Sequence, residues 1–264
     1  MKEESVDRSL SPEVIHYYLT YLWAPAPHTM LKSVKKLEPG HAIVVKDGRI
    51  NRRWQFYDLP YHQPIKPISE NDAVSRLQEK LKTAVERQMV ADVPVGAFLS
   101  GGLDSSAVVA FAKQALPDQK IQCFTIGFKD NNARDEGMID DLPYAKRVAD
   151  HLGVDLHTIY VDSGMINQLE KTICHLDEPE ADPASIHTML ISQLARSHGI
   201  KVLLSGTGGD DVFSGYRRHY ALMQEKYWSW MPKTARSGLR SLSSSLPLNF
   251  PLSRRMAKAL QLCR

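Results

Sequence analysis

Between residues 93 and 204, short apolar runs alternate with longer segments whose apolar residues recur at helical spacing. Short apolar runs bounded by turns are typical of buried strands, and parallel strands require a long crossover, usually a helix, between them. The alternation therefore predicts an α/β fold in which a parallel sheet carries helices on both faces. The predicted strands are residues 93–99, 121–128, 156–161 and 201–204, and the predicted helices are residues 105–116, 143–152, 165–175 and 184–197.

The residues before this region predict a smaller unit. Ser11 followed by Pro12 is typical of a helix start, and Asp47-Gly48 is typical of the turn in a β-hairpin, here between residues 41–45 and 49–54. A proline-rich stretch follows, and a long helix is predicted to begin after Ser69, which resembles the first residue of a capping box. We therefore expect three parts, which are residues 1–68, 69–230 and 231–264.

Composition excludes several classes of protein. The 264-residue chain is 43% hydrophobic and 24% charged, which is typical of a globular protein and not of a disordered or fibrous one. No apolar run reaches the ~18 residues that a membrane-spanning helix needs. Met1 is followed by polar and acidic residues and not by the apolar stretch of a signal peptide. Three scattered cysteines are too few for a disulfide framework or a zinc site, so we expect a cytoplasmic protein.

Charge is distributed unevenly along the chain. The net charge is +3, yet residues 231–264 hold seven Lys or Arg and no Asp or Glu, which leaves the first 230 residues mildly acidic. Such a basic tail is compatible with an arm that binds nucleic acid or a membrane. We favour the alternative that its acidic partner surface lies outside this chain, and we expect neither nucleic acid nor membrane as a partner.

The first predicted strand of the sheet runs into residues 100–106, Ser-Gly-Gly-Leu-Asp-Ser-Ser, where a helix begins. The two glycines let the backbone approach a ligand, and the free N–H groups and dipole at a helix start favour an anion. The hydroxyls of Ser100, Ser105 and Ser106 suit phosphate oxygens. Asp104 would repel phosphate unless a divalent cation bridges them, as Mg²⁺ commonly does. The alternative is a glycine turn whose Asp and Ser only cap the helix.

The last predicted strand ends in a second glycine-rich loop, residues 205–211, Ser-Gly-Thr-Gly-Gly-Asp-Asp. In parallel sheets, ligands bind beyond the carboxyl ends of the strands, so both loops would face one crevice. This predicts a site for a triphosphate and a metal, with Asp104 and Asp210 as metal ligands from opposite sides. The alternative is that Asp210 and Asp211 cap a helix predicted at residues 212–220.

Residues 100–106 resemble the pyrophosphatase loop of the ATP pyrophosphatase superfamily. With Val93-Pro94-Val95-Gly96, Asp177-Glu178-Pro179 and residues 205–216, the chain is similar to the synthetase domain of the glutamine-dependent asparagine synthetases. Residues 17–48 are similar to the junction between that family's glutaminase and synthetase domains. The resemblance covers about residues 10–220. It implies a Rossmann-like adenine nucleotide alpha hydrolase fold, preceded by a small remnant of a glutaminase domain.

The resemblance also implies a reaction with ATP and Mg²⁺. ATP adenylates the β-carboxylate of aspartate, pyrophosphate leaves, and ammonia attacks the acyl-adenylate to give an amide. Leu99 and Ile126 would contact the adenosine through their backbone, although both also suit core packing. The nucleotide-binding residues that the resemblance implies are Leu99, Ser100, Gly101, Gly102, Asp104, Ser105, Ser106, Ile126, Ser205 and Gly206.

Three departures from the family pattern are visible. Lys2 follows Met1 where the family's glutaminase exposes a cysteine nucleophile, and most of that domain is missing. Thr207 stands where the family uses Glu or Asp in forming the acyl-adenylate. The helical region with the family's catalytic lysine is not matched. We therefore expect a fragment that works with a separate glutaminase or C-terminal partner chain. A non-catalytic ATP-binding remnant, and an amidotransferase for another carboxylate such as a sugar acid, remain alternatives.

The sequence also contains two weaker signals for function, an acidic loop and the histidines. Asp177, Glu178 and Asp182 form an acidic loop between prolines, which would either line the crevice or be a solvated turn. The ten histidines show no metal-ligand spacing, and we expect most of them at the surface or in the core.

Overall fold

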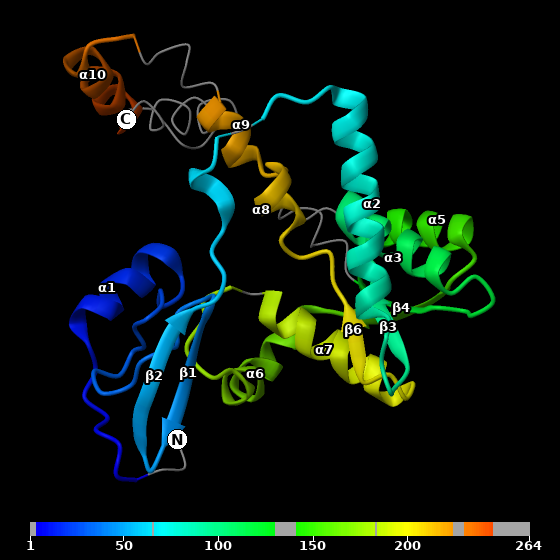
Figure 1. Cartoon of the computed structure of the whole chain (residues 1–264), viewed down its shortest axis with the longest axis horizontal. Coiled ribbons are helices and arrows are strands. Elements are labelled where there is room, and N and C mark those ends of the chain that lie inside the picture. Colours follow the sequence, from blue (N-terminus) through cyan, green and yellow to red (C-terminus); the bar gives the residue numbers. More distant parts are fainter. Residues whose placement is uncertain (1–3, 65, 130–140, 183, 224–229, 245–264) are drawn as a thin grey trace.

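A four-stranded parallel sheet surrounded by helices forms one half of the molecule in Figure 1. The computed structural model describes residues 4–64, 66–129, 141–182, 184–223 and 230–244. The predicted parallel α/β sheet is confirmed, and each predicted strand is found within two residues of its expected bounds. The strands are β3 (Val95–Phe98), β4 (Gln122–Phe128), β5 (Asp155–Val161) and β6 (Val202–Leu204).

The strand order is β5-β4-β3-β6. The chain passes from β3 to β4 and β5 on one side and then returns to the other side of β3 to form β6. The carboxyl ends of β3 and β6 therefore flank the point where the order reverses, which is where ligands bind in open α/β sheets. Ala97 of β3 is level with Leu204 of β6, so the two loops that follow these strands start at the same height.

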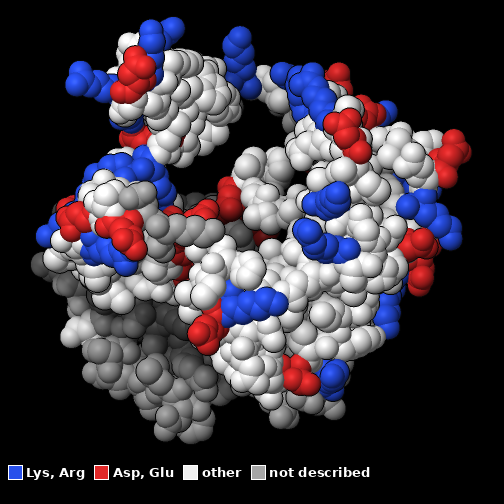
Figure 2. All heavy atoms as spheres, turned by 90° about the horizontal axis from the view of Figure 1, so that it is seen from below, with Lys and Arg blue, Asp and Glu red and all other residues white. Residues whose placement is uncertain are grey.

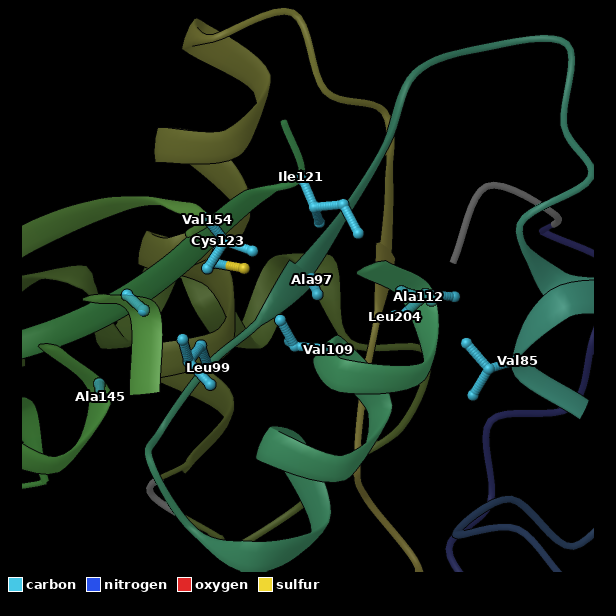
Figure 3. Close-up of a cluster of buried hydrophobic side chains, with 11 residues drawn as sticks. Val85, Ala97, Leu99, Val109, Ala112, Ile121, Cys123, Ala145, Val154 and Leu204 are labelled. Carbon is cyan, nitrogen blue, oxygen red and sulfur yellow. The ribbon is translucent and has the colours of Figure 1, made fainter. Parts of the chain in front are cut away.

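Helices cover both faces of the sheet, as predicted. On one face, α2, α3 and α5 pack on a core that includes Cys123 and the fully buried Val109 (Figure 3). On the other face, α7 packs on Phe124. Neighbouring residues of β4 thus face opposite cores, because side chains alternate along a strand. The bounds are α2 (Glu70–Gln88), α3 (Leu103–Ala115), α5 (Leu142–Leu152) and α7 (Ala184–Ser197).

The N-terminal segment lies to one side of the sheet in Figure 1 and contains the predicted helix and hairpin. Ser11 caps the helix by accepting a hydrogen bond from the Val14 N–H. The hairpin turns at Asp47 and Gly48, whose φ angles of 53° and 72° suit a tight turn between twisted strands. The elements are α1 (Pro12–Tyr21), β1 (His41–Lys46), β2 (Arg49–Gln55) and the 3₁₀ helix η1 (Pro60–His62).

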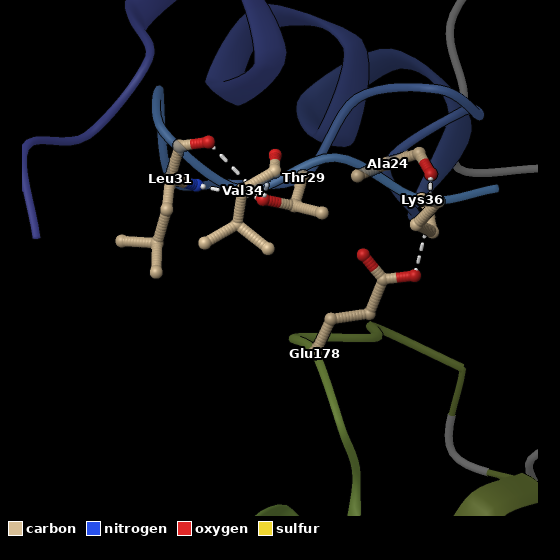
Figure 4. A network of polar contacts seen from close by, with 6 residues as sticks. All are labelled: Ala24, Thr29, Leu31, Val34, Lys36 and Glu178. Atoms are coloured by element: carbon tan, nitrogen blue, oxygen red, sulfur yellow. Dashed lines mark hydrogen bonds and ion pairs between the residues drawn. The ribbon is translucent and has the colours of Figure 1, made fainter. Parts of the chain in front are cut away.

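Lys36 links this segment to the acidic loop that follows α6 (Leu169–His175) (Figure 4). Its Nζ contacts the Glu178 carboxylate and the Ala24 carbonyl, and it lies 5.6 Å from the centre of the Trp23 ring. Glu178 therefore does not line the predicted crevice but joins the N-terminal segment to the sheet domain, whereas Asp177 and Asp182 of the same loop are exposed, as the alternative of a solvated turn predicts.

Two predicted helices are divided. Residues 165–175 form a 3₁₀ helix, η2 (Ser163–Gln168), followed by α6. Residues 212–220 fall into α8 (Gly209–Phe213) and α9 (Arg217–Met223), because Ser214 takes a left-handed conformation with φ 60° and ends α8. The Gly215 N–H then donates to the Asp210 carbonyl at 3.0 Å, which satisfies one of the carbonyls left free at the helix end.

The basic C-terminal region is described only as far as α10 (Lys233–Ser244), and residues 245–264 lie outside the described part. On the face in Figure 2, positive and negative side chains are interspersed and separated by wide uncharged areas. No described helix has the length and apolar character needed to cross a membrane.

Two histidines contact Phe124 on the α7 side of the sheet: His157 stacks on its ring, and His198 meets it edge to face. The His157 ring lies 5.1 Å from Phe124 and 4.1 Å from His198, measured between ring centres. Burial, and secondarily the charge of His198, hold the pKa of His157 below that of a free imidazole. The folded chain thus takes up this proton less readily than the unfolded chain.

We therefore expect the thermal midpoint to fall as the pH drops from about 7.5 to about 5.5, since a depressed histidine pKa stabilises the fold only above the unfolded pKa of ~6.5. His157→Phe keeps the stack on Phe124 but removes the titrating ring, so its midpoint should fall less. Scanning calorimetry of the wild type, H157F and the control H151F, which alters an exposed histidine on α5, measures this. Identical pH dependence in the wild type and H157F would contradict the role of the stack.

Candidate functional site

The two glycine-rich loops lie on one cleft of about 770 Å³ at the carboxyl ends of β3 and β6. The first loop contributes Ser100, Gly102, Asp104 and Ser105, and the second contributes residues 205–210. The level ends of the two strands bring these segments together although they are about a hundred residues apart in the sequence. The predicted shared crevice is thus present in the structure.

The loops touch at two glycines. A Cβ atom at Gly206 would come within 2.6 Å of the Ser105 backbone nitrogen, and a Cβ at Gly209 would overlap the Asp104 carboxylate. Only glycine allows the second loop to approach the first turn of α3 this closely. The Asp104 carboxylate consequently lies beside Gly209, the residue before Asp210.

Within the first loop, the serine hydroxyls brace the start of α3. Ser105 is buried, and its Oγ donates to the Gly102 carbonyl at 3.2 Å and lies 3.0 Å from the Ser100 Oγ. The Ser106 Oγ donates to the same carbonyl at 2.7 Å. Gly101 packs against Tyr144 and Ala145 of α5. In this structure the hydroxyls of Ser105 and Ser106 are engaged inside the loop, and their contact with phosphate stays a prediction.

The second loop is held by a similar contact between hydroxyls. The Ser205 Oγ lies 2.6 Å from the Thr207 Oγ1 and accepts a hydrogen bond from the Thr207 N–H at 3.1 Å. Thr207 is exposed, and Asp210 lies in the first turn of α8. The described residues that line this cleft include two carboxylates, Asp104 and Asp210, but no Lys or Arg. These two negative charges would repel a bare polyanion. They would attract a polyanion that has already bound a divalent cation.

A second cleft, of about 530 Å³, shares Phe98 and Ser100 with the first and so extends it. Leu99 and Ile126 line it, as expected for a nucleotide contact, but their side chains also pack in the core. Leu99 is 1% exposed, and its N–H donates to the Phe124 carbonyl. The wall is largely apolar, with Leu99, Phe124, Ile126, Phe128 and Ile191.

The sequence analysis missed the contribution of α7, whose first turn brings His187 to the second cleft and Thr188 to the first. In parallel α/β folds, helices run antiparallel to the strands, so the start of each helix lies at the binding edge of the sheet. The polar residues in the first turn of α7 were therefore a usable signal. Burial lowers the pKa of His187, which keeps the imidazole neutral near pH 7.

The contacts of the two glycines predict different costs for alanine. Gly206→Ala should lower the free energy of unfolding by about 1–3 kcal/mol, because its Cβ meets backbone that cannot move aside. Gly209→Ala should cost less than about 1 kcal/mol, because the Asp104 carboxylate can rotate away. Urea unfolding measures both, with Gly238→Ala as a control, since a Cβ there meets no atom within 4 Å. Equal losses at Gly206 and Gly209 would contradict the packing described here.

Comparison with known proteins gives a family match. The family model described as "Asparagine synthase" matches residues 76–264. A putative asparagine synthetase (glutamine-hydrolysing) 2 from Methanocaldococcus jannaschii is 32% identical over 255 residues, which cover 96% of this chain and 47% of that protein. Amidase chyE from Penicillium rubens is 29% identical over 234 residues, which cover 81% of this chain and 34% of that protein.

Among solved structures, the NH₃-dependent NAD synthetase from Campylobacter jejuni matches with a TM-score of 0.36 and 15% identity, covering 71% of this chain and 93% of that chain. Among the sequence relatives, asparagine synthetase (glutamine-hydrolysing) 1 from Bacillus subtilis is 30% identical over an alignment that covers 91% of this chain and 37% of that protein. The chain thus spans between a third and a half of the relatives it matches. With a family model that covers most of its length, the chain belongs to the asparagine synthase family.

Proposed function

We propose that this chain binds ATP in the two connected clefts and uses it to convert a carboxylate, aspartate in the first instance, into an amide. One observation carries the proposal: two glycine-rich loops meet at the switch point of the sheet, with the Asp104 carboxylate against Gly209. Membership of the asparagine synthase family supports ATP-dependent amidation as the chemistry of this site.

The two clefts differ in the same way as the two ends of ATP. The cleft lined by Leu99 and Ile126 has apolar walls that suit a flat base. The cleft between the loops is bordered by the first turn of α3, whose N–H groups and dipole favour the negative charge of phosphates, while the N–H groups of Gly102, Thr207 and Gly209 are engaged within the loops. Ser100 belongs to both clefts and would lie near the sugar.

Mg²⁺ fits this donor set as an ion shared with the nucleotide. The described residues contain no group of three or more His, Cys, Asp or Glu that could hold a metal by themselves. Mg²⁺ is commonly bound by one or two carboxylates together with substrate phosphates, and Asp104 and Asp210 provide two. When bound, the ion would neutralise the charge that develops on the departing pyrophosphate.

In the proposed reaction, a carboxylate oxygen attacks the α-phosphorus of ATP, the bond to the bridging oxygen breaks, and pyrophosphate leaves. Ammonia then attacks the carbonyl carbon, AMP leaves, and a proton passes to solvent. The loops contribute by positioning the triphosphate and by stabilising charge through fixed N–H donors. One relative is named an amidase and not an asparagine synthetase, so aspartate is the first carboxylate to test among several.

Asp104→Asn should weaken the binding of ATP by roughly tenfold or more when Mg²⁺ is present, because the charge that holds the ion is removed at almost constant size. With EDTA the substitution should change little or strengthen binding, since repulsion between carboxylate and phosphate is relieved. Titration calorimetry with and without Mg²⁺ measures both effects, and Asp210→Asn should behave in the same way.

Asp211→Asn is the matched control for this experiment. Asp211 follows Asp210 in the same loop, is exposed, and does not line the cleft. If Asp104→Asn and Asp210→Asn bind Mg²⁺–ATP as tightly as Asp211→Asn does, the two carboxylates do not hold the ion, and the two-loop site is wrong.

Thr207 favours a second candidate function, an ATP-binding protein without ligase activity. The resemblance implies a carboxylate at this position, and the Thr207 hydroxyl is engaged with Ser205. A hydroxyl cannot replace a carboxylate that acts as a charge or as a base.

We therefore expect Thr207→Asp to raise aspartate-dependent release of pyrophosphate by roughly tenfold or more, with ammonia supplied, because it restores a general base or counter-charge. The control is Ser205→Ala, which removes the hydroxyl partner of Thr207 without adding a charge. Equal rates for the wild type and Thr207→Asp would show that another group does this work. No release from either protein would favour the non-catalytic alternative.

A further inference from the structure

We propose that His187 contacts the polar edge of the nucleobase and selects a purine with an amino group at its 6-position. The proposal rests on the proposed function, because it assigns a residue to the base-binding end of the same ATP site. Three features of His187 support the proposal: its position, the packing of its ring and its unpaired nitrogen.

The position of His187 and the packing of its ring place this side chain at the cleft. It lies in the first turn of α7, which Ile186 and Leu190 anchor in the core. Its ring meets Phe128 edge to face, at 5.9 Å between ring centres and with an interplanar angle of 75°. Both rings line the second cleft, where His187 is one of four polar residues on a largely apolar wall, with Ser100, Thr125 and Asp141.

The His187 ring also carries an unsatisfied atom. Its Nε2 is buried and has no hydrogen-bond partner among the described residues. Buried polar atoms are almost always paired, so this unpaired nitrogen needs an explanation, and a ligand in the adjoining cleft is the one proposed here. This nitrogen is not exposed in the cleft in the described conformation, so the proposed contact requires the imidazole to turn toward the ligand.

Adenine supplies a complementary partner. A neutral imidazole presents one nitrogen as an acceptor, and the exocyclic amino group of adenine is a donor at the edge of a flat ring. The apolar side chains around His187, among them Leu99 and Ile126, would pack on the faces of the base without distinguishing one base from another. The hydrogen bond from the amino group to His187 would distinguish adenine from a purine that lacks this group.

The test compares Mg²⁺–ATP with the triphosphate of purine riboside, which lacks the 6-amino group, by titration calorimetry. The wild type should bind ATP roughly tenfold more tightly than the analogue, as expected for one hydrogen bond at a desolvated site. His187→Phe keeps an aromatic ring against Phe128 but has no nitrogen, so it should bind both nucleotides with the weaker affinity. His187→Gln retains hydrogen-bonding atoms and should restore part of the preference.

His151→Phe is the control, since His151 lies on α5 and does not line the second cleft. His187→Leu is a second variant without a nitrogen, should the phenylalanine variant not fold, and circular dichroism checks each protein. If the wild type and His187→Phe show the same preference for ATP, the inference about His187 is overturned while the proposed function stands. If the wild type binds no Mg²⁺–ATP, the proposed function fails and this inference fails with it.

Discussion

The close approach of two glycine-rich loops is the constraint on which the rest of the site depends. Gly206 lies against the Ser105 backbone and Gly209 against the Asp104 carboxylate, and a side chain at either position would force the loops apart or displace the carboxylate. The approach is possible because β3 and β6 are hydrogen-bonded neighbours whose ends are level, with Ala97 opposite Leu204. Strand order thus converts two distant sequence segments into one cleft with two carboxylates.

The division of the cleft follows from the alternation of side chains in the sheet. The residues of β3 and β4 that face α7, Phe98, Phe124 and Ile126, give the second cleft its apolar wall. The polar groups come from the loops and from the first turns of α3 and α7, which lie at the same edge of the sheet. A ligand with an aromatic end and an anionic end fits this division, and the asparagine synthase family membership agrees with a nucleotide as that ligand.

Local signals predicted the individual strands, the flanking helices, the hairpin and the glycine-rich loops, because each of these depends on residues close together in the sequence. The local signals did not predict features that depend on contacts between residues distant in the sequence or on an unusual backbone conformation. The Lys36–Glu178 ion pair joins residues 142 positions apart, and no local pattern indicates it. The break between α8 and α9 depends on the left-handed conformation of Ser214, which is unusual for a residue other than glycine. His187 carries no metal-ligand spacing that sets it apart from the other histidines; its place in the first turn of α7, a helix that precedes a predicted strand, is the one sequence feature that indicates the cleft.

The proposed function requires both loops to hold a single metal–triphosphate complex. A crystal structure with Mn²⁺–ATP is the decisive measurement, because the anomalous signal of Mn²⁺ locates the ion without reference to the protein. A shared complex predicts one Mn²⁺ position in the first cleft, with a carboxylate oxygen of Asp104 and one of Asp210 each at about 2.1 Å and phosphate oxygens completing the coordination. An ion held by phosphates and water alone, or a nucleotide bound away from residues 100–106, would contradict it.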